Sequence, residues 1–211
     1  MRNLDLEVAP GERVAILGGD GTGKSALADV IFGLREPDTG AIELDGIDVR
    51  DMKSDTLRRH VALVRDVESI SGSVSENVRM GREWVHPGDV RRALASVGLL
   101  DTVTHLPDGL HTRLNPFGSP LSHNQAIRLM VARALAGSPR LLVLDGTLER
   151  LEEDSQDLLI ANLAGPLAPW TLIVLTHDVE VAERFDRSIR LDSAFDHRHR
   201  PPPRQLPDLH H

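Results

Sequence analysis

Short apolar runs alternate with segments of helical spacing along most of the chain. Apolar runs of strand length stand at 13–17, 61–64, 140–144, 171–175 and 188–191. Helical spacing of apolar residues is found at 26–32, 55–60, 152–163 and 178–185. Apolar strands that alternate with helices indicate a parallel sheet, with ligands gathered at the carboxyl ends of its strands. The pattern therefore predicts an α/β fold.

Two further segments read as short strands. Residues 4–8 alternate apolar and polar positions, as a half-buried strand does, and Pro10-Gly11 then turns the chain into the strand at 13–17. Residues 41–44 are a short apolar run between two turns, at 36–40 and 45–46. We expect both segments to be strands.

The middle of the chain is richer in helix. We expect helices at 73–80, 88–97 and 122–136, the last with Ser122 as its N-cap and Gly137-Ser138-Pro139 as its end. A helical block between strands predicts a helical subdomain of about residues 73–136, inserted in a domain that spans 1–192. Residues 193–211 lack apolar periodicity, and we expect a disordered tail there.

Composition narrows the possible partners. The chain has 211 residues and a net charge of -8, which argues against a nucleic-acid surface because such surfaces are usually basic. It has no cysteine, so disulfide and thiolate chemistry are excluded. The apolar runs are far shorter than the roughly 20 residues that cross a bilayer. We therefore expect contact with a membrane only through a partner chain.

A glycine-rich loop follows the strand at 13–17 and ends in Lys24-Ser25 at the start of a helix. Glycines let successive backbone N–H groups approach phosphate oxygens, and the helix N-terminus adds partial positive charge. Lys24 would reach the terminal phosphates, and the Ser25 hydroxyl would bind Mg2+. This is the pattern of a P-loop. Its nucleotide-binding residues are Gly18, Gly19, Asp20, Gly21, Thr22, Gly23, Lys24, Ser25 and Ala26.

A P-loop by itself is compatible with a kinase, a GTPase or many ATPases, so a second motif has to decide between them. Leu121-Ser122-His123-Asn124-Gln125 opens a helix, and a strand that ends in Asp145 follows, 23 positions after the serine. With this motif the chain resembles the nucleotide-binding domain of ABC transporters, whose pattern is LSGGQ, an RxxxARAL helix, a proline and an apolar strand ending in Asp. The resemblance covers about residues 4–192, and the segment 61–81 is most similar to the exporter branch.

The resemblance implies ATP and Mg2+ as cofactors, a transmembrane transporter subunit or domain as a partner, and a location at the cytoplasmic face of the membrane. It implies that Asp145 holds Mg2+ through water and that His177 contacts the γ-phosphate. Such domains work as head-to-tail dimers, so Leu121, Ser122, His123, Asn124 and Gln125 would cover a nucleotide held by the P-loop of a second domain.

Several departures from the family pattern affect the chemistry. Gly146 stands where the family has the glutamate that polarises the attacking water, and a missing general base costs about 10²- to 10⁴-fold in rate. Glu149, Glu152 and Glu153 follow, in a segment that by the family register faces the dimer partner. The family's Mg2+-sensing glutamine is replaced by Asp66 or Arg65, with the alignment ambiguous by one residue. An aspartate there could hold Mg2+, whereas an arginine could not.

Other departures affect binding. His123 and Asn124 replace two glycines of the signature, and their side chains should weaken the closed dimer. Pro116 stands where exporters usually have glutamate. The aromatic residue that stacks on adenine in the family lies upstream of the P-loop strand, beyond the first residue of this sequence. We therefore expect a reduced affinity for ATP and a fragment of a longer exporter polypeptide.

Three functions are compatible with these residues. The first is an ATP-binding subunit or fragment of an exporter, with attenuated hydrolysis. The second, motivated by Gly146, is a hydrolysis-deficient module whose ATP-dependent dimerisation regulates or holds an assembly. The third is a soluble ABC ATPase of the DNA-repair or translation type. The negative net charge of the chain and the exporter-like segment 61–81 both argue against this third function.

Overall fold

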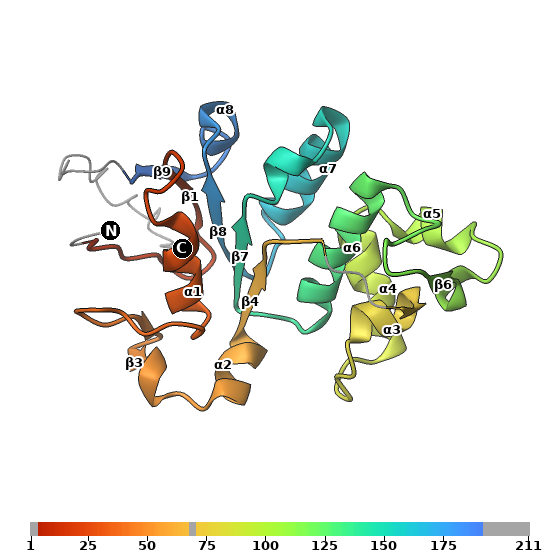
Figure 1. Cartoon of the computed structure of the whole chain (residues 1–211), viewed down its shortest axis with the longest axis horizontal. Helices are drawn as coiled ribbons and strands as arrows, with labels where there is room; N and C mark the ends of the chain where they lie inside the picture. Colours follow the sequence, from red (N-terminus) through yellow and green to blue (C-terminus); the bar gives the residue numbers. More distant parts are fainter. Residues whose placement is uncertain (1–3, 68–70, 192–211) are drawn as a thin grey trace, which may run out of the picture.

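A five-stranded parallel sheet forms the centre of the molecule (Figure 1). The computed structural model describes residues 4–67 and 71–191. The strands stand in the order β4-β7-β8-β1-β9, and every pair of neighbours is parallel. Their bounds are β1 Arg13–Leu17, β4 Val61–Val64, β7 Leu141–Asp145, β8 Thr171–Thr176 and β9 Arg187–Arg190. The predicted α/β fold with a mainly parallel sheet is confirmed.

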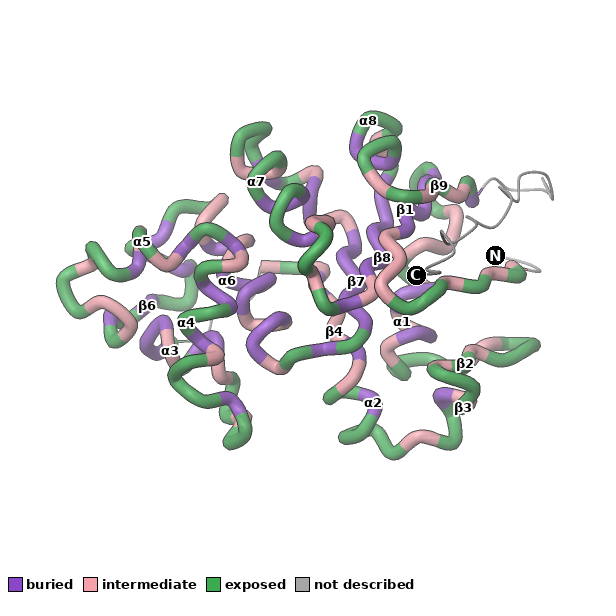
Figure 2. The backbone as a smooth tube through the Cα atoms, turned by 180° about the vertical axis from the view of Figure 1, so that it is seen from behind, coloured by how far each residue is buried: buried purple, intermediate pink, exposed green. Residues whose placement is uncertain are grey.

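Both faces of the sheet are covered, which explains the continuous apolar runs of its strands. Along β7, Leu142 and Leu144 pack with residues of helices α6 (His123–Ala136) and α7 (Glu153–Leu163). Leu141 and Val143, the alternate residues, pack on the other face with helix α1 (Lys24–Ile31). Figure 2 shows the central strands as the most continuously buried part of the chain. These two hydrophobic clusters, one on each face, hold the sheet in place and thereby fix the positions of its strand ends.

The helix-rich middle of the chain lies beyond the β4 edge of the sheet, at one end of the molecule (Figure 1). It contains α3 Val74–Arg79, α4 Pro87–Ser96, α5 Leu100–Thr104, the 3-10 turn η2 Gly109–His111 and α6, with a two-stranded ribbon of β5 Gly72–Ser73 and β6 Arg113–Leu114. The sequence pattern missed α5 and the ribbon because neither is long enough to show a period. The limits of the predicted subdomain, 73–136, and domain, 1–192, stay predictions.

Three predicted elements differ in the structure. Residues 4–8 alternate in burial as expected but form no strand, and the carbonyl of Glu7 accepts a hydrogen bond from the Arg187 side chain instead of a neighbouring strand. The segment 41–44 contributes only β2 (Glu43–Leu44), which forms a separate hairpin with β3 (Ile47–Asp48). The helix predicted over 178–185 is the single turn α8 (Val179–Ala182), because the chain must turn back there to enter β9 beside β1.

The remaining elements are short. They are the 3-10 turn η1 Val49–Asp51, helix α2 Ser54–His60 and the 3-10 turn η3 Leu148–Arg150. Within residues 4–67 and 71–191, no helix combines the length and the apolar character that crossing a membrane requires. The predicted tail, 193–211, lies outside the described residues.

Candidate functional site

The strand order gathers four separate segments at the carboxyl edge of the sheet. The P-loop follows β1, Arg65 follows β4, Asp145 ends β7, and His177 follows β8. They line a cavity of about 430 Å³, within the range of small-ligand pockets. Its lining residues are Asp20, Gly21, Gly23, Lys24, Ser25, Ala26, Arg65, Asp66, Asp145, Gly146, Glu149, Arg150, Leu175, Thr176 and His177.

Three glycines of the P-loop are favoured by its backbone: Gly18, Gly21 and Gly23. A Cβ atom at Gly18 would lie 2.6 Å from the hydroxyl oxygen of Thr22 and 3.2 Å from the carbonyl oxygen of Leu191. Gly21 and Gly23 have φ angles of 77° and 98°, in the left-handed region that favours glycine. Gly23, the N-cap residue of α1, makes no side-chain hydrogen bond to the start of the helix. The first N–H groups of α1 and the positive end of its dipole therefore remain available to an anion in the cavity.

Lys24 is folded across the loop that precedes it. Its ammonium nitrogen donates hydrogen bonds to the carbonyl oxygens of Gly18, at 2.5 Å, and of Gly19, at 2.8 Å. The positive charge of Lys24 therefore lies over the P-loop, next to the glycines and the first N–H groups of α1 that are available to an anion. Gly19 and Asp20 complete the loop, and Ser25 and Ala26 form the first turn of α1.

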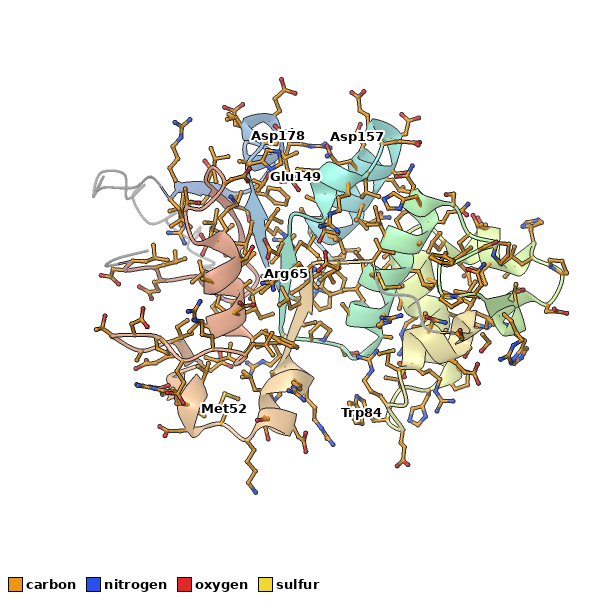
Figure 3. All side chains as sticks on the ribbon, in the orientation of Figure 1. Met52, Arg65, Trp84, Glu149, Asp157 and Asp178 are labelled. Atoms are coloured by element: carbon orange, nitrogen blue, oxygen red, sulfur yellow. The ribbon has the colours of Figure 1, made fainter. Side chains whose placement is uncertain are left out.

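Arg65 is the central charged residue of the cavity, and Figure 3 shows it between α1 and the strands β4 and β7. Its Nε donates to Asp145 Oδ2 at 2.6 Å, and its Nη2 donates to Asp29 Oδ1 at 2.8 Å and to the Ser25 carbonyl oxygen at 3.0 Å. Partial burial by itself lowers the pKa of Arg65. Hydrogen bonds to Asp29 and Asp145, and the charges of both carboxylates, outweigh this effect and raise that pKa.

The predicted Mg2+ ligands Ser25, Asp145 and Asp66 do not form a cation site in this arrangement. An oxygen of the Asp145 carboxylate is occupied by the Arg65 guanidinium, and Asp66 points to Arg150, whose Nη2 lies 3.2 Å from its carboxylate. Across the described ranges, no group of three histidine, cysteine or acidic side chains is arranged to hold a metal. A divalent ion here would stand beside a guanidinium, so the residues as arranged do not fit Mg2+.

The opposite side of the cavity lacks the expected carboxylate at Gly146 but holds another one nearby. Gly146 has a φ of 62°, and a Cβ atom there would meet open space. Glu149 lies one 3-10 turn downstream, and its Oε1 accepts hydrogen bonds from the Thr176 hydroxyl and, at 3.2 Å, from the backbone N–H of His177. The Nδ1 atom of His177 is 3.7 Å from the same oxygen, and this histidine side chain is 63% exposed.

Within this chain Glu149 lines the cavity, and the expectation that its segment also faces a dimer partner stays a prediction. The turn η3 directs the side chain back to the end of β8, where it lines the cavity, and Figure 3 shows it between α7 and α8. Its second carboxylate oxygen, Oε2, is buried without a hydrogen-bond partner among the described residues. Glu152 and Glu153 stand instead at the start of α7, outside the cavity lining.

The signature segment 121–125 is not among the residues that line the cavity. Ser122 caps α6, and its side chain and that of Gln125 form a reciprocal capping box with N···O distances of 3.3 and 2.8 Å. The Asn124 side chain accepts a hydrogen bond from the backbone of Glu152. Leu121 is buried, and His123 is exposed. The role of this segment on a second domain's nucleotide stays a prediction.

Two features of the site were not assigned from the sequence. The sequence pattern does not identify Asp29 as the charge partner of Arg65, since its only signal is its place four residues after Ser25, on the same face of α1. The sequence also left open whether Arg65 or Asp66 takes the position after β4, and in the structure Arg65 is the residue that contacts Asp145.

Comparisons with known proteins agree with the geometry. The family model for ABC transporters matches residues 1–149. An ATP-dependent lipid A-core flippase of Thiobacillus denitrificans is 34% identical over 194 residues, which is 91% of this chain and 34% of the relative. ABC transporter 1 of Ajellomyces capsulatus is 32% identical over 187 residues, 87% of this chain and 14% of that protein.

A solved structure shows the same fold. A bacterial Atm1-family ABC exporter with ATP bound superposes with a TM-score of 0.81 at 27% identity, over 89% of this chain and 33% of that one. The chain therefore spans about a third, or less, of the length of the relatives that it matches.

Proposed function

We propose that this chain, which belongs to the ABC transporter family as an ATP-binding domain, binds ATP in the cavity at the carboxyl edge of its sheet. We further propose that it couples ATP binding, with slow hydrolysis at most, to export through a transmembrane partner at the cytoplasmic face of the membrane. The observation that carries the proposal is the convergence of the P-loop, Asp145 and His177 on one cavity. The names of the relatives support the export function.

The proposed complex contains two such domains, arranged head to tail. The segment 121–125 would then cover the nucleotide of the other domain, as its place outside the cavity lining allows. If the partner domain has a complete set of motifs, hydrolysis would survive at the site that combines the partner's P-loop with this chain's signature segment. The site that contains Gly146 would hydrolyse slowly.

A measurement of ATP affinity tests the nucleotide site. We expect Lys24→Ala to weaken ATP binding about tenfold or more, because charge-assisted hydrogen bonds to phosphate contribute roughly 1.5 to 3 kcal/mol. Isothermal titration calorimetry on the wild type and the variant measures it. The matched control is Lys53→Ala, since Lys53 is the chain's other lysine and is exposed before α2. Equal affinities of the wild type and Lys24→Ala would overturn the proposal.

The second candidate function is a module that binds ATP, dimerises and does not hydrolyse. Gly146 favours this second function, since the residue that directly follows Asp145 in the sequence has no carboxylate. Gly146→Glu restores one in open space, but the left-handed backbone costs any non-glycine residue roughly 1–2 kcal/mol. Gly146→Ala is the matched control because it has the same strain and no carboxylate.

ATP turnover by these two variants separates the candidates. A gain of about 10²- to 10⁴-fold for Gly146→Glu over Gly146→Ala identifies an ATPase whose missing base was limiting. Retained binding without any gain supports the dimerisation module.

A further inference from the structure

The Arg65 guanidinium lies where three groups of the nucleotide site meet. It contacts the Asp145 carboxylate at the end of β7, and the Ser25 carbonyl and Asp29 carboxylate on α1. Ser25 and Asp145 are the residues from which the sequence predicted a divalent cation site. The contact with Ser25 is to its backbone carbonyl and not to the hydroxyl that was predicted to bind Mg2+, so the guanidinium competes with a divalent ion at the Asp145 carboxylate.

Asp145 needs a positive partner in this structure. Its side chain is only 7% exposed, and a buried carboxylate without a counter-charge or hydrogen bonds is strongly disfavoured. Arg65 supplies both, through an N–H···O contact of 2.6 Å. Asp29 and Ser25 hold the other side of the guanidinium, so the group is fixed at three points and is not a freely moving surface charge.

The guanidinium still has donors for a ligand. Of its five N–H groups, Nε uses one and Nη2 uses two on the acceptors described above. The Nη1 group has no acceptor among the described residues, and Arg65 lines the cavity with 30% of its side chain exposed. Planar guanidinium donors match the geometry of phosphate oxygens. Arg65 and Lys24 thus present two fixed positive charges to a polyphosphate.

We propose that Arg65 is the built-in cation of this site: it neutralises Asp145, keeps that carboxylate from a divalent metal, and makes nucleoside triphosphate binding independent of such a metal. The proposal rests on the proposed nucleotide site. Mg2+ ordinarily neutralises the β- and γ-phosphates in P-loop sites. In this chain Arg65 and Lys24 perform that neutralisation, and entry of a divalent ion would require the Arg65–Asp145 pair to break.

Calorimetric titration with ATP, once with Mg2+ and once with EDTA, tests the proposal. We expect the wild-type affinity to change less than about threefold between the two conditions, while in EDTA Arg65→Gln binds about tenfold or more weakly than the wild type. Mg2+ should restore part of the affinity of Arg65→Gln, because Asp145 is released to the metal. Arg58→Gln, at an exposed position on α2, is the matched control and should behave as the wild type does.

The outcomes are distinct. A wild-type affinity that falls tenfold or more in EDTA, as in an ordinary P-loop site, overturns the proposal even if Arg65→Gln fails to fold. Equal affinities of the wild type and Arg65→Gln in EDTA also overturn it. Absence of ATP binding by the wild type in both conditions would contradict the proposed function instead. The thermal midpoint of the wild type, which should rise with ATP equally in both conditions, is the second readout.

Discussion

The two sides of the nucleotide cavity differ in how their charges are paired. On the side of β4 and α1, Arg65 ties Asp145 and Asp29 together through short contacts, with Asp145 almost fully buried. On the side of β8, one carboxylate oxygen of Glu149 accepts a hydrogen bond from the backbone N–H of His177. The other carboxylate oxygen of Glu149 has no hydrogen-bond partner among the described residues, and the His177 imidazole is mostly exposed. On the first side the charged groups are paired with one another in a closed ion-pair network. On the second side, acceptor and donor groups remain without such partners among the described residues.

This difference indicates where the departures from the family pattern act. We propose that the extra cation at Arg65 affects phosphate binding and metal dependence. We propose that the absence of a carboxylate at Gly146 affects hydrolysis. Stability measurements distinguish the two sides because a closed network should be costlier to break than a partly open one.

The largest effect is expected for Arg65→Ala. The substitution leaves the buried Asp145 carboxylate without its cation, and we expect the free energy of unfolding to fall by about 2–3 kcal/mol. Urea unfolding followed by circular dichroism measures the change. Arg58→Ala, at an exposed position, should stay within about 0.5 kcal/mol of the wild type. A loss for Arg65→Ala no larger than that of the control would show that the pair contributes little.

A smaller effect is expected for Glu149→Ala. The Thr176 hydroxyl, which is fully buried, and the His177 N–H both lose an acceptor, so we expect a loss of about 1–2 kcal/mol in the same assay. The His177 ring resonances in NMR spectra should shift, because the backbone that carries the ring is released. Glu152→Ala changes an exposed glutamate before α7 and should leave these resonances in place. Unchanged His177 resonances in Glu149→Ala would contradict the contact.

The smallest effect is expected for Asp66→Ala. Asp66 and Arg150 form an ion pair between side chains that are 60% and 43% exposed, and such surface pairs contribute at most about 1 kcal/mol. We expect less than about 0.5 kcal/mol of lost stability and an ATP affinity in Mg2+ within about twofold of the wild type. A tenfold loss of affinity that appears only with Mg2+ would identify Asp66 as a metal ligand after all.

Much of the fold could be read from local patterns. The strands of the sheet, the P-loop and the helix capped by Ser122 each depend on neighbouring residues, namely an apolar run, glycines at positive φ and a capping box. The alternation at 4–8 predicts a strand, and the burial of these residues alternates as expected, but their backbone pairs with no strand of the described chain. Alternation reports which side chains face a core, and it does not by itself provide the main-chain hydrogen bonds that define a strand pair.

The sequence alone determines the conformation of the P-loop, because its glycines and Lys24 act through backbone geometry within a few residues. The pairing of Asp145 with Arg65, 80 residues apart, and of Arg65 with Asp29, 36 residues apart, depends on the order of strands and on the packing of α1 against them. A shift of one residue after β4 would exchange Arg65 for Asp66 and reverse the charge beside Asp145. Local patterns do not encode that choice, since it is made by contacts between distant elements.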